Sequence, residues 1–265
     1  MTWVGLLFSC IALGVLQGLT EFLPVSSSGH LVMLQGLLGF KENPVAFDLL
    51  LHLATLGAVF LYFRRDLGRL AASLFPPYTR GAEERRMVLW ILAATVVTAA
   101  IGLGLKHQVE VLFSTPRWVS GALLYTGLLL FLGDWVESGD VRSEEVGLRR
   151  SLVIGFFQGV AVFPGVSRSG STVVAAILTG MERDEAGRFS FLLAVPAILG
   201  AAVLEAPHIS RIPSKLYLPY LAGMVAAFVV GYAAISLFLK AIRARSLKWF
   251  AIYCWGVALA GFLLF

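Results

Sequence analysis

A polar segment occurs twice in this otherwise apolar chain. The first copy, QGLTEFLPVSSSGH, covers residues 17–30, and the second, QGVAVFPGVSRSGS, covers residues 158–171. The copies lie 141 positions apart, and seven of their first thirteen positions are identical. Because polar segments rich in glycine and serine fit poorly among apolar helices, a duplicated one predicts two halves of a single buried site.

The composition is typical of an integral membrane protein. Hydrophobic residues make up 58% of the chain, charged residues 14%, and the mean hydropathy is +0.83, more than a soluble domain needs for its core. Apolar runs close to the ~20 residues of a spanning helix occur at 46–63, 87–105, 117–134, 187–206, 217–239 and 248–265. The sequence therefore predicts an all-α integral membrane protein with six transmembrane helices, in a single membrane domain over residues 1–265.

The N-terminal stretch and the cysteines are expected to be structural. Trp3 to Leu16 is apolar, with no basic residue before it and no small-residue cleavage pattern after it, so we expect it to be retained. Cys10 and Cys254 lie in apolar segments, where a free thiol usually packs as a small hydrophobe. We expect neither to form a disulfide, bind a metal or take part in catalysis.

The distribution of lysine and arginine predicts an orientation. If the two polar repeats are re-entrant hairpins, the loops at 64–86, 135–150, 181–188 and 240–248 share one side and hold fifteen of the 21 basic residues. The opposite loops hold five: Lys41, Lys106, Arg117, Arg211 and Lys215. The positive-inside rule then places both termini outside the cytoplasm. A basic face against anionic lipid accounts for the net charge of +5 without a nucleic-acid partner.

The same arrangement predicts that the two repeats are inverted. Repeat 1, about residues 1–135, and repeat 2, about residues 148–265, each hold a re-entrant helical hairpin followed by three crossings, so their orientations are opposite. Gly14 matches Gly155 at the same offset, which extends the similarity beyond the polar segments. Inverted-topology repeats of broken helices place a site near the bilayer midplane, with helix N-termini directed at an anionic ligand.

Each polar segment has the residues of a helix break followed by a new helix. Pro24 and Pro164 end one helical segment, and the serines after them can cap the next. Gly165 and Gly170 permit tight turns and a close approach of backbone to a ligand. Each hairpin thus offers free N–H groups and a positive dipole end, which favour a phosphate or diphosphate. The alternative is that these residues only allow close helix packing and kinks.

Ionisable residues in the two segments favour the ligand interpretation. The planar guanidinium of Arg168 can bind two phosphate oxygens, and it is costly at membrane depth unless an anion accompanies it. Glu21, which shares a helical face with Gln17, could act as a general base, hold a divalent cation or orient His30. The alternative is a structural ion pair between Arg168 and Glu21. Both interpretations bring the hairpins together.

The nucleophile candidates are Ser26, Ser27, Ser28 and His30. On a helix, Ser27 and Ser26 lie three and four residues before His30, so a hydroxyl and the imidazole could share one face. A Ser-x-x-His spacing is weak by itself, and His30 could instead bond a backbone carbonyl.

The other histidines are weaker candidates for a functional role. His52 lies at helical spacing from Asp48, and packing or an interfacial hydrogen bond is the favoured interpretation of that pair over a functional role. His107 and His208 fall in predicted outer loops, and we assign them no role.

The two segments resemble the signatures of a known family. Gln17-x-x-x-Glu21 followed by PVSSSGH, residues 24–30, resembles the first signature of bacterial undecaprenyl-diphosphate phosphatases of the bacitracin-resistance type. PGVSRSGST, residues 164–172, is similar to their second, a Pro-Gly-x-Ser-Arg-x-x-x-Thr pattern. The resemblance covers essentially the whole chain, including its length, duplication and helix arrangement.

The resemblance implies removal of the terminal phosphate of undecaprenyl diphosphate at the outer, periplasmic face of the bacterial cytoplasmic (inner) membrane. That reaction recycles the lipid carrier for peptidoglycan synthesis and confers bacitracin resistance. The partners implied are a polyprenyl diphosphate substrate and membrane lipid, and the implied cofactor is a divalent cation, Mg²⁺ or Ca²⁺.

The resemblance also carries the family's roles onto residues of this chain. Together with the chemistry above it gives four catalytic candidates: Glu21, Ser27, His30 and Arg168. The substrate-binding candidates are Gln17, Ser26, Ser28, Gly165, Ser167, Ser169, Gly170 and Thr172. Glu21 is also the candidate metal ligand, but many relatives resemble Glu-x-x-x-Glu where this chain has Gln17. A neutral amide weakens the case for a protein-bound metal pair, so the diphosphate is the alternative carrier of the cation.

Two other function classes share parts of the pattern. Inverted repeats with broken helices also occur in secondary transporters, so a transporter or flippase of a lipid-linked (di)phosphate is the alternative function. Phosphatidate-type phosphatases share a Ser-Gly-His element, but they need a histidine six residues after their Ser-Arg arginine, and Val174 stands there. We exclude that class. The sequence leaves open a homodimer, and it leaves open Ser27, His30 or water as the nucleophile.

Overall fold

The structure, a computed structural model, describes residues 2–75, 81–113, 115–209 and 212–265. Over these residues it is built from α-helices, as predicted: α1 (Trp3–Phe22), α2 (Ser27–Leu38), α3 (Pro44–Tyr62), α4 (Arg64–Ser73), α5 (Ala82–Gly104), α6 (Lys106–Phe113), α7 (Pro116–Trp135), α8 (Gly147–Val160), α9 (Arg168–Leu178), α10 (Arg183–Ile209), α11 (Tyr217–Arg243) and α12 (Leu247–Leu264). Arg211, assigned above to an outer loop, lies outside the described residues.

Seven helices of the described chain, rather than the predicted six, are long and apolar enough to cross a membrane. The six predicted segments correspond to α3, α5, α7, α10, α11 and α12, and the seventh is α1. We expected α1 to be one arm of a hairpin that does not cross. It nevertheless runs unbroken for 20 residues, because the first strong helix breaker, Pro24, follows its last residue, Phe22.

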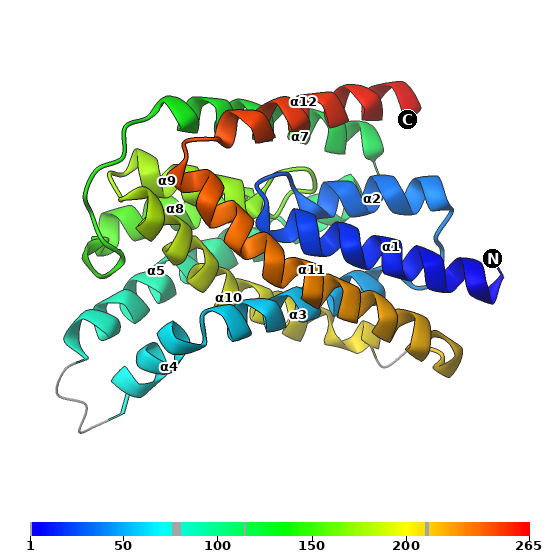
Figure 1. The fold of residues 1–265 in the computed structure, drawn as a ribbon, viewed down its shortest axis with the longest axis horizontal. Helices are drawn as coiled ribbons and strands as arrows, with labels where there is room; N and C mark the ends of the chain where they lie inside the picture. The colour runs from blue at the N-terminus through cyan, green and yellow to red at the C-terminus, as the bar shows by residue number, and fades with distance from the viewer. Residues whose placement is uncertain (1, 76–80, 114, 210–211) are drawn as a thin grey trace.

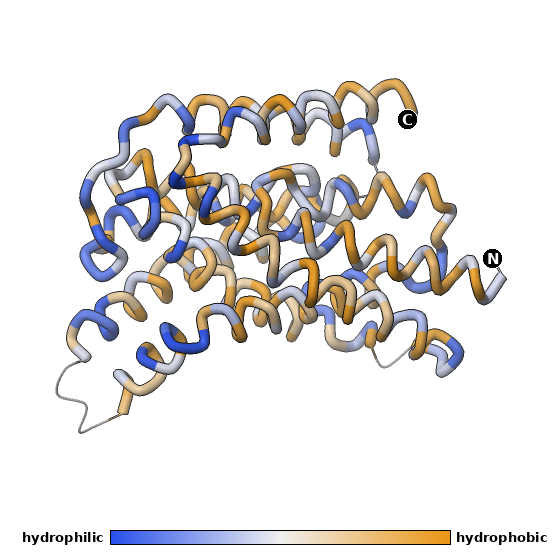
Figure 2. The backbone as a smooth tube through the Cα atoms, viewed as in Figure 1, coloured by the Kyte–Doolittle hydropathy of each residue, from blue (hydrophilic) through white to orange (hydrophobic). Residues whose placement is uncertain are grey.

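The long helices run roughly along the long axis of the molecule, as Figure 1 shows. Both termini lie at the right-hand end of that view, whereas α4, the α7–α8 connection and the α11–α12 connection lie toward the left. Hydrophilic residues gather at the left end (Figure 2). Arg188 pairs with Asp66 at 2.7 Å and Arg243 with Asp184 at 2.6 Å. These four residues belong to the loops and adjoining helix ends predicted to share one side.

Two helical hairpins, α1–α2 and α8–α9, approach each other from opposite ends of the molecule, and their turns meet (Figure 1). The Ser169 hydroxyl donates to the Leu23 carbonyl at 3.2 Å, and Gly29 packs against Gly165. The polar repeats at the two turns therefore lie side by side, as their duplication predicts.

The matched glycines of the two repeats occupy equivalent places. Gly14 of α1 packs directly on Gly223 of α11, and Gly155 of α8 packs on Ala94 of α5. In each case a Cβ would collide with the backbone of the partner helix, so only glycine permits this approach. These close helix contacts set how far each hairpin extends along its partner helix and hence where its turn lies.

Candidate active site

Each turn is built by the residues that the sequence analysis identified as a helix break and a new cap. The Ser26 side chain accepts from the Gly29 N–H at the start of α2, and the Ser167 side chain accepts from the Gly170 N–H at the start of α9. The predicted serine caps are therefore confirmed. Ser27 and Arg168 become the first residues of these two helices, and both N-termini meet at the contact between the hairpins.

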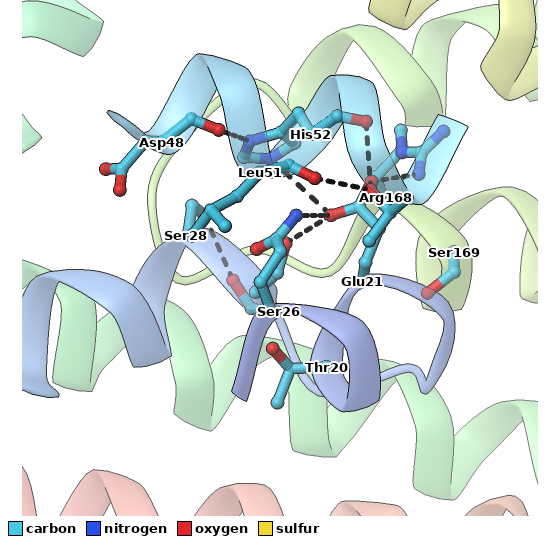
Figure 3. A network of polar contacts seen from close by, with 12 residues as sticks. Thr20, Glu21, Ser26, Ser28, Asp48, Leu51, His52, Arg168 and Ser169 are labelled. Carbon is cyan, nitrogen blue, oxygen red and sulfur yellow. Dashed lines mark hydrogen bonds and ion pairs between the residues drawn. The ribbon is translucent and has the colours of Figure 1, made fainter. Parts of the chain in front are cut away.

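Glu21 is the centre of the polar network that joins the hairpins (Figure 3). Its side chain is only 3% exposed, and its Oε1 lies 2.6 Å from Nη2 of Arg168. The Ser27 hydroxyl donates to Oε2 at 2.6 Å, and the Gln17 amide donates to the same oxygen at 3.0 Å. The ion pair considered in the sequence analysis is thus present, and it holds the candidate nucleophile Ser27 against a carboxylate.

His52 also reaches this network, although the sequence analysis favoured a packing role for it. Its Nε2 lies 3.5 Å from Oε2 of Glu21, and its Nδ1 lies 2.7 Å from the Asp48 carbonyl (Figure 3). The Asp48 carboxylate accepts from Gln35 of α2 at 2.6 Å, which fixes α3 against the first hairpin. Only the packing of α3 on that hairpin brings His52 to Glu21, so no local pattern could have identified the contact.

His30 belongs to a different set of contacts. Its Nδ1 lies 2.8 Å from the Ser26 carbonyl, and its Nε2 lies 2.9 Å from the Tyr253 hydroxyl of α12. A carbonyl can only accept, so Nδ1 donates and Nε2 accepts from Tyr253. Both ring nitrogens are therefore engaged away from Ser27 and Glu21.

Several predicted substrate-binding residues instead connect parts of the protein. Ser167 and Ser169 share a hydroxyl contact of 3.3 Å, as do Ser26 and Ser28. The Thr172 hydroxyl bonds to that of Ser190 in α10, and Thr172 is only 1% exposed. Contact of Thr172 with a substrate would therefore require it to leave an internal hydrogen bond.

The two glycines of the second repeat have conformational and packing roles. Gly165 has a φ of +93°, which favours glycine, and it packs closely on Val119 of α7. Gly170 lies against Pro24 of the other hairpin. They bring the two backbones together at the site, and a direct contact with substrate stays a prediction.

Thr126 of α7 is a supporting residue that the sequence analysis missed. Its hydroxyl accepts from the Ser167 N–H at 3.1 Å and donates to the Gly165 carbonyl at 2.9 Å, and the residue is 1% exposed. It therefore satisfies two backbone groups of the turn that presents Arg168. A lone threonine in an apolar helix gave no sequence signal for this role.

Comparison with known proteins decides the family. The family model described as bacitracin resistance protein BacA matches residues 10–260. This chain belongs to the bacitracin resistance protein BacA family. The resemblance read from the two signatures is therefore confirmed.

Relatives of this BacA-family chain match it over more than nine-tenths of its length. It is 43% identical over 255 residues to a protein of Desulfosudis oleivorans named undecaprenyl-diphosphatase, covering 92% of this chain and 93% of the relative. Proteins of the same name from Carboxydothermus hydrogenoformans and Methanosphaera stadtmanae are 40% and 36% identical, each covering 94% of this chain. The match covers 93% of the Carboxydothermus protein and 94% of the Methanosphaera protein.

The polar network of this BacA-family chain does not fit a divalent cation held by the protein alone. Among the described residues there is no group of three or more His, Cys, Asp or Glu placed to hold a metal ion. Both oxygens of Glu21 already accept from donor groups, and Gln17 turns its NH₂ rather than its oxygen toward the carboxylate. The prediction that Glu21 binds a metal therefore gains no support from the arrangement of these side chains.

Replacing Thr126 with valine in this BacA-family chain should lower the free energy of unfolding by about 1–3 kcal/mol. Valine has a similar shape but leaves the Ser167 N–H and the Gly165 carbonyl buried without their partner. The measurement is the melting temperature of the purified protein in detergent. Thr126→Ser keeps the hydroxyl and should melt close to wild type, and equal melting of the valine variant would contradict the supporting role.

Proposed function

We propose that this chain is an undecaprenyl-diphosphatase, which hydrolyses undecaprenyl diphosphate to undecaprenyl phosphate and inorganic phosphate. The observation that carries the proposal is the contact of Glu21 with Ser27 and Arg168, each at 2.6 Å. A carboxylate, a hydroxyl and a guanidinium meet there at two helix N-termini, as phosphoryl transfer requires. The names of the relatives support the same activity.

The positive end of the site binds the diphosphate. Arg168 is 20% exposed while its carboxylate partner Glu21 is 3% exposed, so the guanidinium lies nearer to an arriving anion. The N-termini of α2 and α9 add two dipole ends directed at the same place. Charge that develops on the phosphoryl oxygens is stabilised by groups that are already in position.

The reaction is proposed to run through a phosphoserine. Ser27 Oγ attacks the terminal phosphorus while its proton passes to Oε2 of Glu21, 2.6 Å away. A bond forms between Oγ and phosphorus, the bond to the bridging oxygen breaks, and undecaprenyl phosphate leaves. The proton on Glu21 leaves with the departing undecaprenyl phosphate. Water then attacks the phosphoserine while Glu21 takes one of its protons, the bond between Oγ and phosphorus breaks, Glu21 returns that proton to Oγ of Ser27, and inorganic phosphate is released. The contacts of His30 with Ser26 and Tyr253 favour Ser27 over His30 as the nucleophile.

The divalent cation is proposed to enter as part of the substrate. Each oxygen of Glu21 already accepts from at least one donor, whereas a diphosphate binds Mg²⁺ or Ca²⁺ through its own oxygens. A cation bound to the diphosphate neutralises phosphate charge, and the protein supplies the remaining positive groups. No carboxylate pair of the chain is needed in this scheme.

An apolar groove next to the site is proposed to hold the prenyl tail. It has a volume of about 270 Å³, and residues of α1, α2 and α12 line it, including Met33 and Val257. His30 also lines the groove and lies one helical turn from Ser27, so the groove begins beside the reacting group. The tail can lie there while the diphosphate reaches Arg168.

The two hairpins are proposed to be re-entrant and the two repeats to be inverted in the membrane. The approach of α1–α2 and α8–α9 from opposite ends supports this, as does the matched packing of α1 on α11 and of α8 on α5. The basic loops then face the cytoplasm, and both termini and the opening of the site face the periplasm.

Purified protein in detergent should release inorganic phosphate from undecaprenyl diphosphate. The reason is that a nucleophile, Ser27, and a phosphate-binding guanidinium, Arg168, both contact the base Glu21. The measurement is phosphate release over time, with a preparation of Glu21→Gln as the inactive control. The same protein in liposomes is used to test the alternative function, a flippase of the lipid-linked diphosphate. Movement of labelled lipid across the bilayer without phosphate release would show a flippase and overturn the proposal.

A further inference from the structure

The mechanism above gives no role to His52, whose side chain reaches the network around Glu21. It extends from α3, whereas Arg168 extends from α9, and both side chains are directed at Glu21 (Figure 3). We propose that His52 is a second phosphate-binding residue, which holds the terminal phosphate together with Arg168. The inference rests on the proposed function, since the ligand is the diphosphate of that reaction.

The hydrogen bond of Nδ1 leaves a single ring nitrogen for this task. Nδ1 of His52 lies 2.7 Å from the Asp48 carbonyl, which can only accept, so Nδ1 carries a hydrogen and the ring is held in one orientation. Nε2 is then the atom that faces the network, 3.5 Å from Oε2 of Glu21. Since Nδ1 already carries a hydrogen, Nε2 donates only from the imidazolium form of the ring, and a phosphate oxygen can accept from that N–H as a carboxylate oxygen does.

Exposure places His52 where an anion can reach it. Its side chain is 29% exposed and that of Arg168 is 20% exposed, whereas that of Glu21 is 3% exposed. The two donors therefore lie on the accessible side of the buried carboxylate. The Asp48 carboxylate accepts from Gln35, whereas the Asp48 carbonyl accepts from the His52 ring.

The free site then resembles the occupied one. Two donors from different repeats, His52 and Arg168, face Glu21, whose two oxygens take the places that phosphate oxygens take in the complex. When the phosphate accepts from both donors, Glu21 is left with Ser27 and Gln17. The carboxylate is then a stronger acceptor for the Ser27 proton, because Arg168 and His52 no longer face it.

The test compares wild type with His52→Ala and His52→Gln as purified full-length protein. Two quantities are measured: kcat/KM with undecaprenyl diphosphate, and the rise in melting temperature caused by orthovanadate, a phosphate-like anion that needs no turnover. His52→Ala is expected to lower kcat/KM by about 10- to 100-fold, the value of a hydrogen bond to a charged group. The stabilisation by orthovanadate is expected to fall with it. His52→Gln keeps a donor N–H and is expected to recover part of both.

His107→Ala is the control, because His107 is an exposed histidine of α6 with no assigned role. Unchanged stabilisation of His52→Ala by orthovanadate would overturn the inference, even if activity fell, since a residue that only supports Glu21 would leave anion binding intact. If His52→Ala does not fold, the test rests on His52→Gln. Wild-type values of both kcat/KM and the stabilisation by orthovanadate in that variant would overturn the inference. Failure of the wild type to release phosphate would refute the proposed function, while the orthovanadate measurement would still test His52.

Discussion

Replacement of Arg168 by alanine is expected to reduce phosphate release by at least about a thousandfold. The guanidinium is the group that meets the phosphate charge, and its Nη2 lies 2.6 Å from Oε1 of Glu21. Its loss removes stabilisation of the transition state and leaves a buried carboxylate without its main partner. The measurement is initial phosphate release from undecaprenyl diphosphate. Arg168→Lys keeps the charge but not the planar fork, and it should retain only a small part of the activity.

A second substitution separates the loss of catalysis from a loss of folding. The double variant Glu21→Gln/Arg168→Ala removes the unpaired charge, so it should melt at a higher temperature than Arg168→Ala alone while staying inactive. Arg117→Ala, an exposed arginine outside the network, should match wild type in both measurements. Undiminished phosphate release by Arg168→Ala would refute the site.

Replacement of Ser27 by alanine is expected to reduce phosphate release by about 10³- to 10⁴-fold. The Ser27 hydroxyl is 2.6 Å from Oε2 of Glu21, so it is both activated and placed at a helix N-terminus. Wild-type protein mixed with labelled substrate and quenched rapidly should carry phosphate on Ser27. Phosphoserine survives acid whereas phosphohistidine does not, so an acid quench distinguishes Ser27 from His30.

Two results would contradict the phosphoserine. An acid-labile label that disappears in His30→Ala would make His30 the nucleophile, and Tyr253 would have to release it first. Full activity of Ser27→Ala would leave water as the attacking group with Glu21 as its base. Ser236→Ala is the matched control, because Ser236 lies in α11 and contacts Tyr62 rather than the network.

Much of the fold could be predicted from hydropathy and helix-terminating residues. The predicted run at 117–134 became α7 (Pro116–Trp135), and the run at 217–239 became α11 (Tyr217–Arg243). The sequence analysis expected α1 to be a hairpin arm because of the polar turn after it, although the length and apolarity of α1 match a spanning helix. Length and composition do not distinguish the two, since both expose an apolar surface to lipid.

The polar residues of the site were predicted, but several of their contacts were not. The duplication predicted that Glu21 and Arg168 lie close together. The structure confirms this contact between residues 147 positions apart. Thr126 and Tyr253 were missed as partners because each lies in an apolar helix with no local motif, and His52 was paired with Asp48 but not with Glu21. The hydroxyl of Thr126 could equally have bonded within its own helix, as many threonine hydroxyls do.

The sequence by itself determined the membrane-type composition, the helix breaks at Pro24 and Pro164, the serine caps and the duplicated motif. These depend on residues that are neighbours along the chain, so local propensity and hydropathy suffice. The tertiary structure decided which helix presses on which hairpin. It thereby decided that His52 faces Glu21 while His30, only three residues after Ser27, faces Tyr253. Such choices depend on close packing between distant helices, as at Gly14 on Gly223, and no short stretch of sequence records them.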